Sequence, residues 1–128
     1  MVAAFSALLL SALFFAHSSS LRSAELLMFE HAGCPWCVMW HREIGPIYPK
    51  TEEGQRAPLR RIALTNGMPP EVSFVGPVTA TPTFVLVENG KEIGRLTGYR
   101  DDASFWGLLG VLLQKLPTAG QGEQRRVL

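Results

Sequence analysis

The four residues Cys34-Pro35-Trp36-Cys37 constrain the fold of this chain more than any other feature. They hold the only two cysteines among its 128 residues. The apolar residues 26–29 just before them predict a buried strand. The residues from Pro35 onward predict a helix, because proline is well tolerated in a first helical turn. A cysteine at such a strand-to-helix junction lies at the positive end of the helix, where its thiolate is stabilised. The pair is therefore predicted to switch between dithiol and disulfide.

Two other uses of the cysteine pair stay open on the residues alone. A purely structural disulfide is disfavoured, because a bridge that spans three residues removes little entropy from the unfolded chain. Together with His31 and His41, the two cysteines also have the ligand types of a zinc or copper site. Against a metal site, we interpret His41 as a surface or helix-packing residue. We interpret His31 either as a plain loop residue or as a cation that stabilises the Cys34 thiolate.

The first 20 residues contain no charged side chain, and residues 2–16 are almost wholly apolar. Fifteen helical residues reach only about 22 Å, which is short of the roughly 30 Å hydrocarbon core of a bilayer. This length predicts a cleaved export signal over residues 1–20. The small residues Ala16 and Ser18 favour cleavage after Ser18, with Ser20 as an alternative site. An uncleaved membrane anchor and a cytosolic chain are the competing interpretations.

Length and charge limit the remaining possibilities. A chain of 128 residues suffices for one domain and is too short for two. Its 12 Lys and Arg residues are balanced by 11 Asp and Glu residues. The arginine pairs at 60–61 and 125–126 are too short to form the basic surface that nucleic acids require. We therefore expect no nucleic-acid partner.

The pattern along the chain predicts an α/β domain over residues 24–116 and a frayed tail over residues 117–128. Gly45-Pro46 must kink or end the first helix, and Asn89-Gly90 is the strongest short-range signal for a hairpin. Strands are expected at residues 24–29, 59–64, 83–87 and 92–96, with residues 71–78 ambiguous. A last helix begins at residues 101–104, and its predicted apolar face consists of Phe105, Leu108, Leu109, Leu112, Leu113 and Leu116.

These elements combine in a restricted way. A strand–helix–strand unit implies a parallel pair of strands, and the hairpin adds an antiparallel strand. The predicted fold is therefore a mixed four-stranded sheet flanked by helices on both faces.

From about Ala24 to Leu116 the chain resembles the thioredoxin superfamily. The resemblance rests on CPWC after an apolar strand and on Thr81-Pro82-Thr83-Phe84 before a hydrophobic strand. The Asn-Gly hairpin, Gly98 and the terminal amphipathic helix complete it. A CPWC followed by Trp40-His41 is similar to the small periplasmic thioredoxin-like proteins encoded with sulfur-oxidation (Sox) systems. The resemblance implies a thioredoxin-like fold with a minimal N-terminus, because the initial strand and helix of full thioredoxins have no counterpart before residue 24.

The resemblance also implies a role for each matching residue. Cys34 matches the nucleophilic cysteine, which attacks a substrate disulfide, and Cys37 matches the resolving cysteine, which then releases the reduced substrate. Pro82 matches the cis-proline whose loop lies against the two cysteines. Thr81 before it would offer backbone hydrogen bonds to an extended substrate segment. An exposed Trp36 suggests an apolar docking patch with Pro35, Thr81 and Tyr99, whereas the alternative is that Trp36 packs over Trp40.

The chain departs from the thioredoxin pattern behind the cysteines. Thioredoxins have a buried aspartate six residues before the first cysteine, and Met28 stands there in this chain. Glu30, two residues further along the same strand, is a possible substitute as the proton acceptor for Cys37. The alternative interpretation is a solvated glutamate at the end of the strand.

Taken together, these features lead us to expect an exported thiol–disulfide oxidoreductase that acts in the periplasm as a monomer, without cofactor or metal. Thr81 before the cis-proline is similar to the reductant and isomerase members, which favours reduction of a partner protein's disulfide or oxidised cysteine. A membrane thiol transporter would recharge the protein, and its substrate would be the sulfur-carrying subunit of the Sox complex. A disulfide-forming oxidase or isomerase and a metal-handling binding module are the alternatives.

Overall fold

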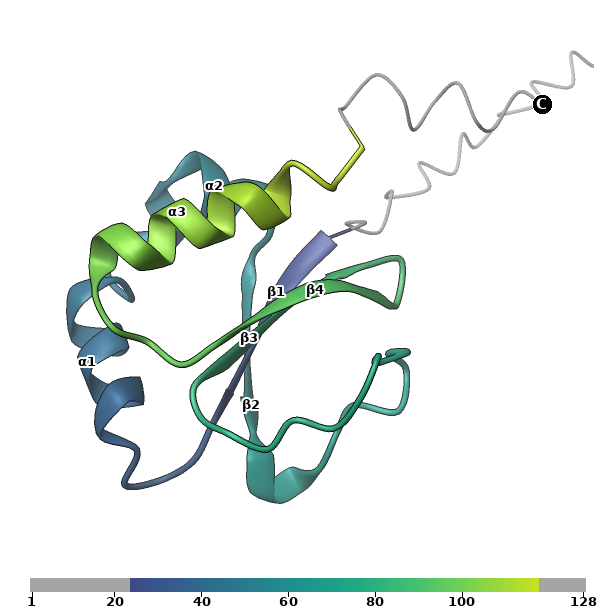
Figure 1. Ribbon diagram of the computed structural model, residues 1–128, viewed down its shortest axis with the longest axis horizontal. Coiled ribbons are helices and arrows are strands. Elements are labelled where there is room, and N and C mark those ends of the chain that lie inside the picture. Colours follow the sequence, from purple (N-terminus) through teal and green to yellow (C-terminus); the bar gives the residue numbers. More distant parts are fainter. Residues whose placement is uncertain (1–23, 118–128) are drawn as a thin grey trace, which may run out of the picture.

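The computed structural model describes residues 24–117, which form one sheet with helices beside it (Figure 1). The strands are β1 (Ala24–Glu30), β2 (Leu59–Ala63), β3 (Thr83–Glu88) and β4 (Lys91–Thr97), and the α-helices are α1 (Pro35–Glu43), α2 (Glu52–Arg56) and α3 (Asp102–Leu113). Two short 3₁₀ helices, η1 (Tyr48–Lys50) and η2 (Leu64–Asn66), lie between them. The predicted export signal over residues 1–20 and the tail from residue 118 onward lie outside the described residues.

The sheet is mixed and four-stranded, in the order β2-β1-β3-β4. β1 pairs in parallel with β2, as the β1–α1–β2 crossover requires, and in antiparallel fashion with β3. β3 and β4 form the predicted hairpin, and its turn residues Asn89 and Gly90 both have positive φ, at 49° and 74°. These values suit the two-residue turns that match the twist of paired strands. The predicted fold class is therefore confirmed.

The two faces of the sheet are covered differently. One face packs against all three α-helices around Trp40, which is fully buried beside Tyr48, Phe84 and Phe105. The other face, which includes Leu27, is covered by the irregular segment 64–78. The expectation of helices on both faces is wrong for the described residues, because the second face is covered by side chains of segment 64–78, in which η2 is the only helix.

The path of the chain between α1 and β2 is determined by residues within that segment. α1 ends at Glu43, just before the predicted break at Gly45-Pro46. A Cβ at Gly45 would lie 2.7 Å from the carbonyl oxygen of His41, so only glycine fits there. Thr51 then caps α2, because its Oγ1 accepts a hydrogen bond from the Gly54 amide at 3.0 Å.

The apolar face of α3 is rotated from its predicted position. Phe105, Leu109, Leu112, Leu113 and Leu116 are buried, but Leu108 is 54% exposed. Trp106 is partly buried instead and stacks on Tyr48, with the ring centroids 6.0 Å apart. Since successive helical residues turn by roughly 100°, Leu108 lies at one margin of the predicted stripe and Trp106 beyond the other.

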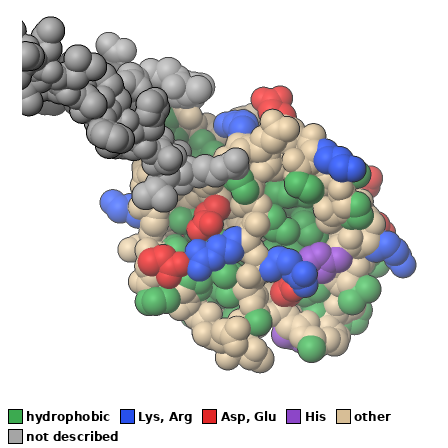
Figure 2. All heavy atoms as spheres, turned by 180° about the vertical axis from the view of Figure 1, so that it is seen from behind, with side chains coloured by type: hydrophobic (Ala, Val, Ile, Leu, Met, Phe, Trp, Pro, Cys, Tyr) green, Lys and Arg blue, Asp and Glu red, His purple; other side chains and the backbone are tan. Residues whose placement is uncertain are grey.

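Charged side chains on the surface occur mostly in pairs. Arg60 of β2 contacts Glu25 and Glu71, and Arg61 contacts Glu30. Acidic and basic side chains accordingly lie next to one another on the face shown in Figure 2. Within residues 24–117, none of the helices has both the length and the apolar character needed to cross a bilayer.

Candidate active site

The cysteine pair lies at the junction between β1 and α1. Gly33 has a φ of 82° and turns the chain, and Cys34 then caps the helix with extended backbone angles. Pro35 stands in the first turn, where a missing N–H costs little. The Cys34 Sγ accepts a hydrogen bond from the Cys37 amide at 3.2 Å. The Cys37 amide and the dipole of the first turn thus point at the first sulfur, an arrangement that would stabilise its thiolate.

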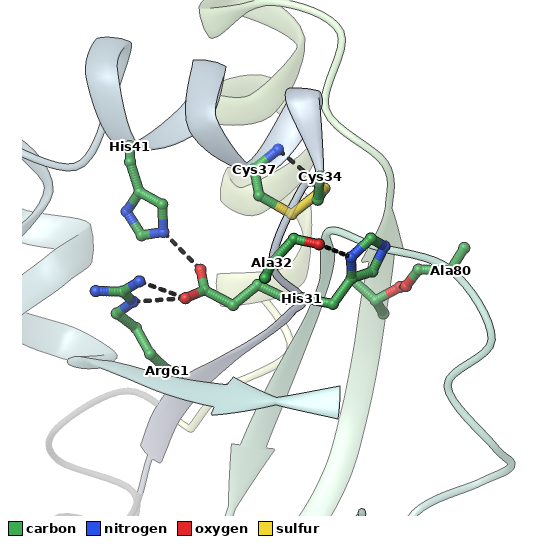
Figure 3. Close-up of a disulfide and its surroundings, with 9 residues drawn as sticks. His31, Ala32, Cys34, Cys37, His41, Arg61 and Ala80 are labelled. Carbon is green, nitrogen blue, oxygen red and sulfur yellow. Dashed lines mark hydrogen bonds and ion pairs between the residues drawn. A yellow bond between two sulfur atoms is a disulfide. The ribbon is translucent and has the colours of Figure 1, made fainter. Parts of the chain in front are cut away.

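In this structure Cys34 and Cys37 form a disulfide (Figure 3). Both residues are recessed, with 3% and 4% of their surface exposed. Their neighbours in the same motif lie outside, since Pro35 is exposed and Trp36 is 51% exposed. The aromatic neighbours of Trp40 in the described part of the chain are His41, Tyr48, Phe84 and Phe105, so Trp36 does not pack over it as an aromatic pair.

Sheet register brings the Thr81-Pro82 segment to the same end of the molecule. Thr83 pairs with Phe29 of β1 and with Thr97 of β4, so Pro82 lies beside the chain that leads from β1 to Cys34. The Thr81–Pro82 peptide bond is cis, as the resemblance implies. The segment is held by the Gly98 amide, which donates to the Pro82 carbonyl at 2.7 Å. Pro82 itself is buried, and Thr81 is partly exposed.

Tyr99 follows Gly98 at this end, but it does not contribute to an exposed patch. Its side chain is buried in the helix-covered core at 6% exposure. Its hydroxyl donates to a carboxylate oxygen of Glu43 at 2.5 Å. Burial, with the hydrogen bond to Glu43, raises the pKa of Tyr99 above its ordinary value. The expectation that this ring is exposed for docking is therefore wrong.

Glu30, the last residue of β1, has two partners. Its Oε2 is 2.5 Å from the His41 Nε2, and its Oε1 accepts hydrogen bonds from Arg61, one of them at 2.9 Å from Nε. Only 15% of its side chain is exposed. The interpretation of a solvated glutamate is wrong, because both carboxylate oxygens are engaged by protein groups.

The charge of Glu30 is fixed by these contacts. Burial alone raises the pKa of this carboxyl, but the hydrogen bonds from Arg61 and His41 outweigh burial, so its pKa lies below the ordinary value. Glu30 is therefore an ionised carboxylate between a guanidinium and an imidazole. We refer to Glu30, His41 and Arg61 as the charge cluster.

Sequence reasoning found Glu30 and His41 separately and missed both their contact and the part played by Arg61. Register carries the signal that joins them, because Arg61 pairs with Met28, the residue two before Glu30 in the same strand. His41 lies one turn of α1 after Cys37, on the side of the helix that faces the strand ends. The sequence predicted that β1 and β2 pair in parallel but did not give their register. With the register known, Arg61 would have been expected near Glu30.

The possible metal set is not assembled among the described residues. His41 is bound to Glu30, and His31 is exposed with its Nδ1 2.6 Å from the Ala32 carbonyl (Figure 3). Within residues 24–117, no three His, Cys, Asp or Glu side chains gather as a metal ion would need.

Comparisons with known proteins agree with this geometry. A family model of a thioredoxin-like domain matches residues 22–112. The solved periplasmic thioredoxin SoxS from Paracoccus pantotrophus, in its reduced form, is 44% identical, with a TM-score of 0.70, over 72% of this chain and 97% of that chain. Thioredoxin f2 from Chlamydomonas reinhardtii shares the fold, with 15% identity and a TM-score of 0.55 over 78% and 85% of the two chains. No curated protein matches the chain by sequence.

The match to the family model covers most of the chain, and the match to SoxS covers nearly all of that protein. The cysteine pair, its place at the start of a helix and the cis-proline lie within the matched region. The chain therefore belongs to the thioredoxin-like family, as a thiol–disulfide oxidoreductase.

Proposed function

We propose that this oxidoreductase is an exported reductant of protein disulfides. The observation that carries the proposal is the pairing of Cys34 and Cys37 at the start of α1, at the same end of the sheet as the cis Thr81–Pro82 bond. Cys34 acts as the nucleophile, because its sulfur lies where the helix stabilises negative charge. Cys37 then resolves the mixed disulfide. Pro82 shapes the floor of the site, and its own lack of an N–H leaves the sulfurs without a backbone donor there.

The reaction balances within two steps. The Cys34 thiolate attacks one sulfur of the partner's disulfide, which forms a mixed disulfide and releases the partner's other sulfur as a thiolate. Cys37 then loses its proton and attacks the Cys34 sulfur, which closes the Cys34–Cys37 bond and releases the second partner thiolate. Two electrons pass from the enzyme dithiol to the partner, and the enzyme ends in the disulfide form.

A partner would dock on the exposed rim of the motif. Trp36 and Pro35 offer apolar surface beside the recessed sulfurs, and the half-exposed Thr81 offers backbone groups to an extended segment. In this proposal Glu30 accepts the proton that Cys37 gives up. We propose that the protein acts in the periplasm, after cleavage of residues 1–20, as a monomer recharged by a membrane thiol donor. Its substrate in this proposal is a disulfide or an oxidised cysteine of a Sox sulfur-carrier protein, which the similarity to SoxS supports.

The direction of electron flow is tested by the reduction potential. We expect equilibration of the purified protein with glutathione buffers to give a value below about −220 mV, whereas a value near −120 mV would make the protein an oxidant. The substrate is tested by Cys37→Ser, which should hold the mixed disulfide through Cys34. Mass spectrometry of trapped complexes from the source cells would identify the partner. Cys34→Ser is the control that should trap nothing, and if Cys37→Ser also trapped nothing, the exchange scheme would be wrong.

A further inference from the structure

The helix α3 is apolar on more than the side that it buries. Among its 12 residues only Asp102 is charged. On the side away from the core, Leu108 is 54% exposed and Val111 is 57% exposed. A helix that is apolar on all sides is normally covered on all sides. Within residues 24–117, however, no other element covers this outward side of α3.

The outward side of α3 borders a groove. A hollow of about 780 Å³ lies between α3 and the end of β4, and its lining includes Leu96, Gly98, Arg100, Gly107, Leu108 and Val111. The members from α3 recur at steps of three and four residues, so they share one side of the helix. The volume is within the range of about 300–1,000 Å³ that is usual for binding clefts. We refer to this hollow as the α3 groove.

The α3 groove begins at the end of the sheet that carries the reactive residues. β4 ends at Thr97, at the same end of the sheet where β1 ends and leads to Cys34. Gly98 lines the groove, and its amide donates to the Pro82 carbonyl at 2.7 Å. In Figure 1 the chain passes from β4 through this end of the molecule into α3, which then runs back along the sheet. A partner whose sulfur is attacked by Cys34 must lie at this end, where the groove starts.

The rim of the α3 groove offers backbone groups as well as apolar side chains. Within residues 24–117, β4 pairs with β3 along one edge, and along its other edge it pairs only with Ser73, opposite Lys91. The last residues of β4, Leu96 and Thr97, therefore have an open edge beside the groove. An open sheet edge binds an extended peptide segment, while pockets next to the edge take its side chains. The surroundings of the groove thus suit an extended segment of polypeptide.

The α3 groove selects for an uncharged side chain. Arg100 is the only charged residue in its lining. The guanidinium of Arg100 is 3.1 Å from the Asp101 carboxylate and donates to the Ser104 hydroxyl at 2.9 Å. A charged side chain that entered the groove would lose water without gaining an unpaired opposite charge. An apolar side chain would instead contact Leu96 and Leu108 and leave water with them.

We propose that the α3 groove binds an extended segment of the substrate protein, with one uncharged apolar side chain seated between α3 and β4. This inference rests on the proposed reductant function and adds a substrate class to it. The substrates are proteins in which an apolar residue lies a short distance along the chain from the reactive cysteine. The groove takes no part in electron transfer, and it holds the partner while Cys34 attacks.

The test uses synthetic peptides whose single cysteine carries thionitrobenzoate in a mixed disulfide. Each peptide has one phenylalanine, before or after the cysteine, behind a spacer of about two to eight glycines that extends over about 7–28 Å. When the Cys34 thiolate of the reduced protein attacks the peptide sulfur, thionitrobenzoate leaves, and its absorbance gives the second-order rate constant. We expect the best-spaced phenylalanine peptide to react roughly tenfold faster than an all-glycine peptide of the same length, because its ring leaves water on binding.

Variants of the α3 groove should lose this preference for phenylalanine. In Leu108→Gln and Val111→Gln we expect the ratio of the two rate constants to fall below about twofold, because the apolar contact is lost. Gly107→Gln should lower the ratio by filling the groove. It should also fold, because a Cβ at Gly107 meets no atom within 4 Å and glutamine favours a helix more than glycine does. Val75→Gln is the matched control and should keep the full ratio, because Val75 is 85% exposed and lies outside the groove.

The possible failures are distinguishable. An unaltered protein that releases no thionitrobenzoate from any peptide would refute the proposed function itself. A reaction with the all-glycine peptide and no gain from phenylalanine at any spacing would refute the groove alone. A gain that persists in both Leu108→Gln and Val111→Gln, or a larger gain from glutamate or lysine in place of phenylalanine, would also overturn the proposal. Sedimentation should show a monomer, and a dimer that Val111→Gln dissociates would mean that a second copy of the chain occupies the groove instead.

Discussion

Tyr48 shows how a single buried hydroxyl fixes a turn. Its side chain is 1% exposed, and the hydroxyl donates to the Ala57 carbonyl at 2.6 Å. Burial raises the pKa of Tyr48 above its ordinary value. This hydrogen bond connects the residues after α1 to the end of α2. In this region no strand or long helix provides hydrogen-bond partners for the backbone groups.

We expect Tyr48→Phe to lower the free energy of unfolding by about 1–3 kcal/mol, because it leaves the Ala57 carbonyl buried without a donor. Urea denaturation followed by fluorescence measures the change. Tyr99→Phe is the matched control and should cost less, because the Glu43 side chain that loses its donor is 37% exposed and can bind water. Equal losses in both variants would contradict the explanation.

At the scale of residues, the sequence predicts the parts of the site that are local. Cys34, Cys37 and Pro35 follow one another, so the cap, the first turn and the disulfide need only a strand before and a helix after. Tyr99 and the charge cluster depend on tertiary packing instead. An aromatic residue after a strand can face either way, and in this structure Tyr99 is buried next to Phe105 of α3.

Among the elements, β4 holds the segment that covers the second face of the sheet. The Glu92 side chain is 3% exposed and binds Arg95, with the Arg95 Nε 2.5 Å from Oε1. Glu92 also accepts from the Val75 amide at 2.8 Å. Arg95 in turn donates to the carbonyls of Pro77 and Gly76. This pair therefore fastens the irregular segment onto the edge of the hairpin.

Glu92 should make stability depend on pH. The hydrogen bond from Arg95, and then that from the Val75 amide, hold the pKa of this carboxyl below its ordinary value despite burial. A lowered pKa in the folded state means that the stabilisation is complete above the ordinary glutamate pKa and is lost as pH falls through the folded value. We expect Glu92→Gln to unfold more easily than the parent at pH 7, with a smaller difference near pH 3.

Urea denaturation at several pH values measures this effect, and Glu52→Gln, an exposed glutamate of α2, is the control. A Glu92→Gln deficit that stayed constant down to pH 3 would mean that the carboxylate charge contributes nothing.

The elements also mark where sequence patterns lose precision. The hairpin was predictable because Asn89-Gly90 specifies its own turn. Segment 71–78 was not, since it owes its path to Arg95 and Glu92, which lie about twenty residues away. The spacing of apolar residues predicted α3 correctly but placed Leu108 on its buried face. Spacing alone does not decide whether a residue at the edge of the apolar face is buried.

For the whole molecule, folding and disulfide formation belong to one thermodynamic cycle. The difference in unfolding free energy between the oxidised and reduced forms equals the difference in the free energy of closing the disulfide in the folded and unfolded chains. A protein that reduces its partners has a disulfide that is favoured by its fold. We therefore expect reduction of Cys34–Cys37 to lower the free energy of unfolding, by about 1.4 kcal/mol for every 30 mV between the two potentials.

Urea denaturation with and without a phosphine reductant measures this difference. The double variant Cys34→Ser with Cys37→Ser should not respond to the reductant. A reduced form more stable than the oxidised form would indicate that the protein oxidises its partners.

The ion pairs of β2 have a consequence for how copies of the chain meet. In the described part of the molecule β2 is an outermost strand, and a bare outermost strand invites pairing with a foreign one. Arg60 and Arg61 stand there already neutralised by Glu25, Glu71 and Glu30. A second chain that added a strand to β2 would have to remove water and the paired carboxylates from these two arginines. The edge strand next to the cysteine pair therefore resists aggregation, while Trp36 stays exposed for a partner protein.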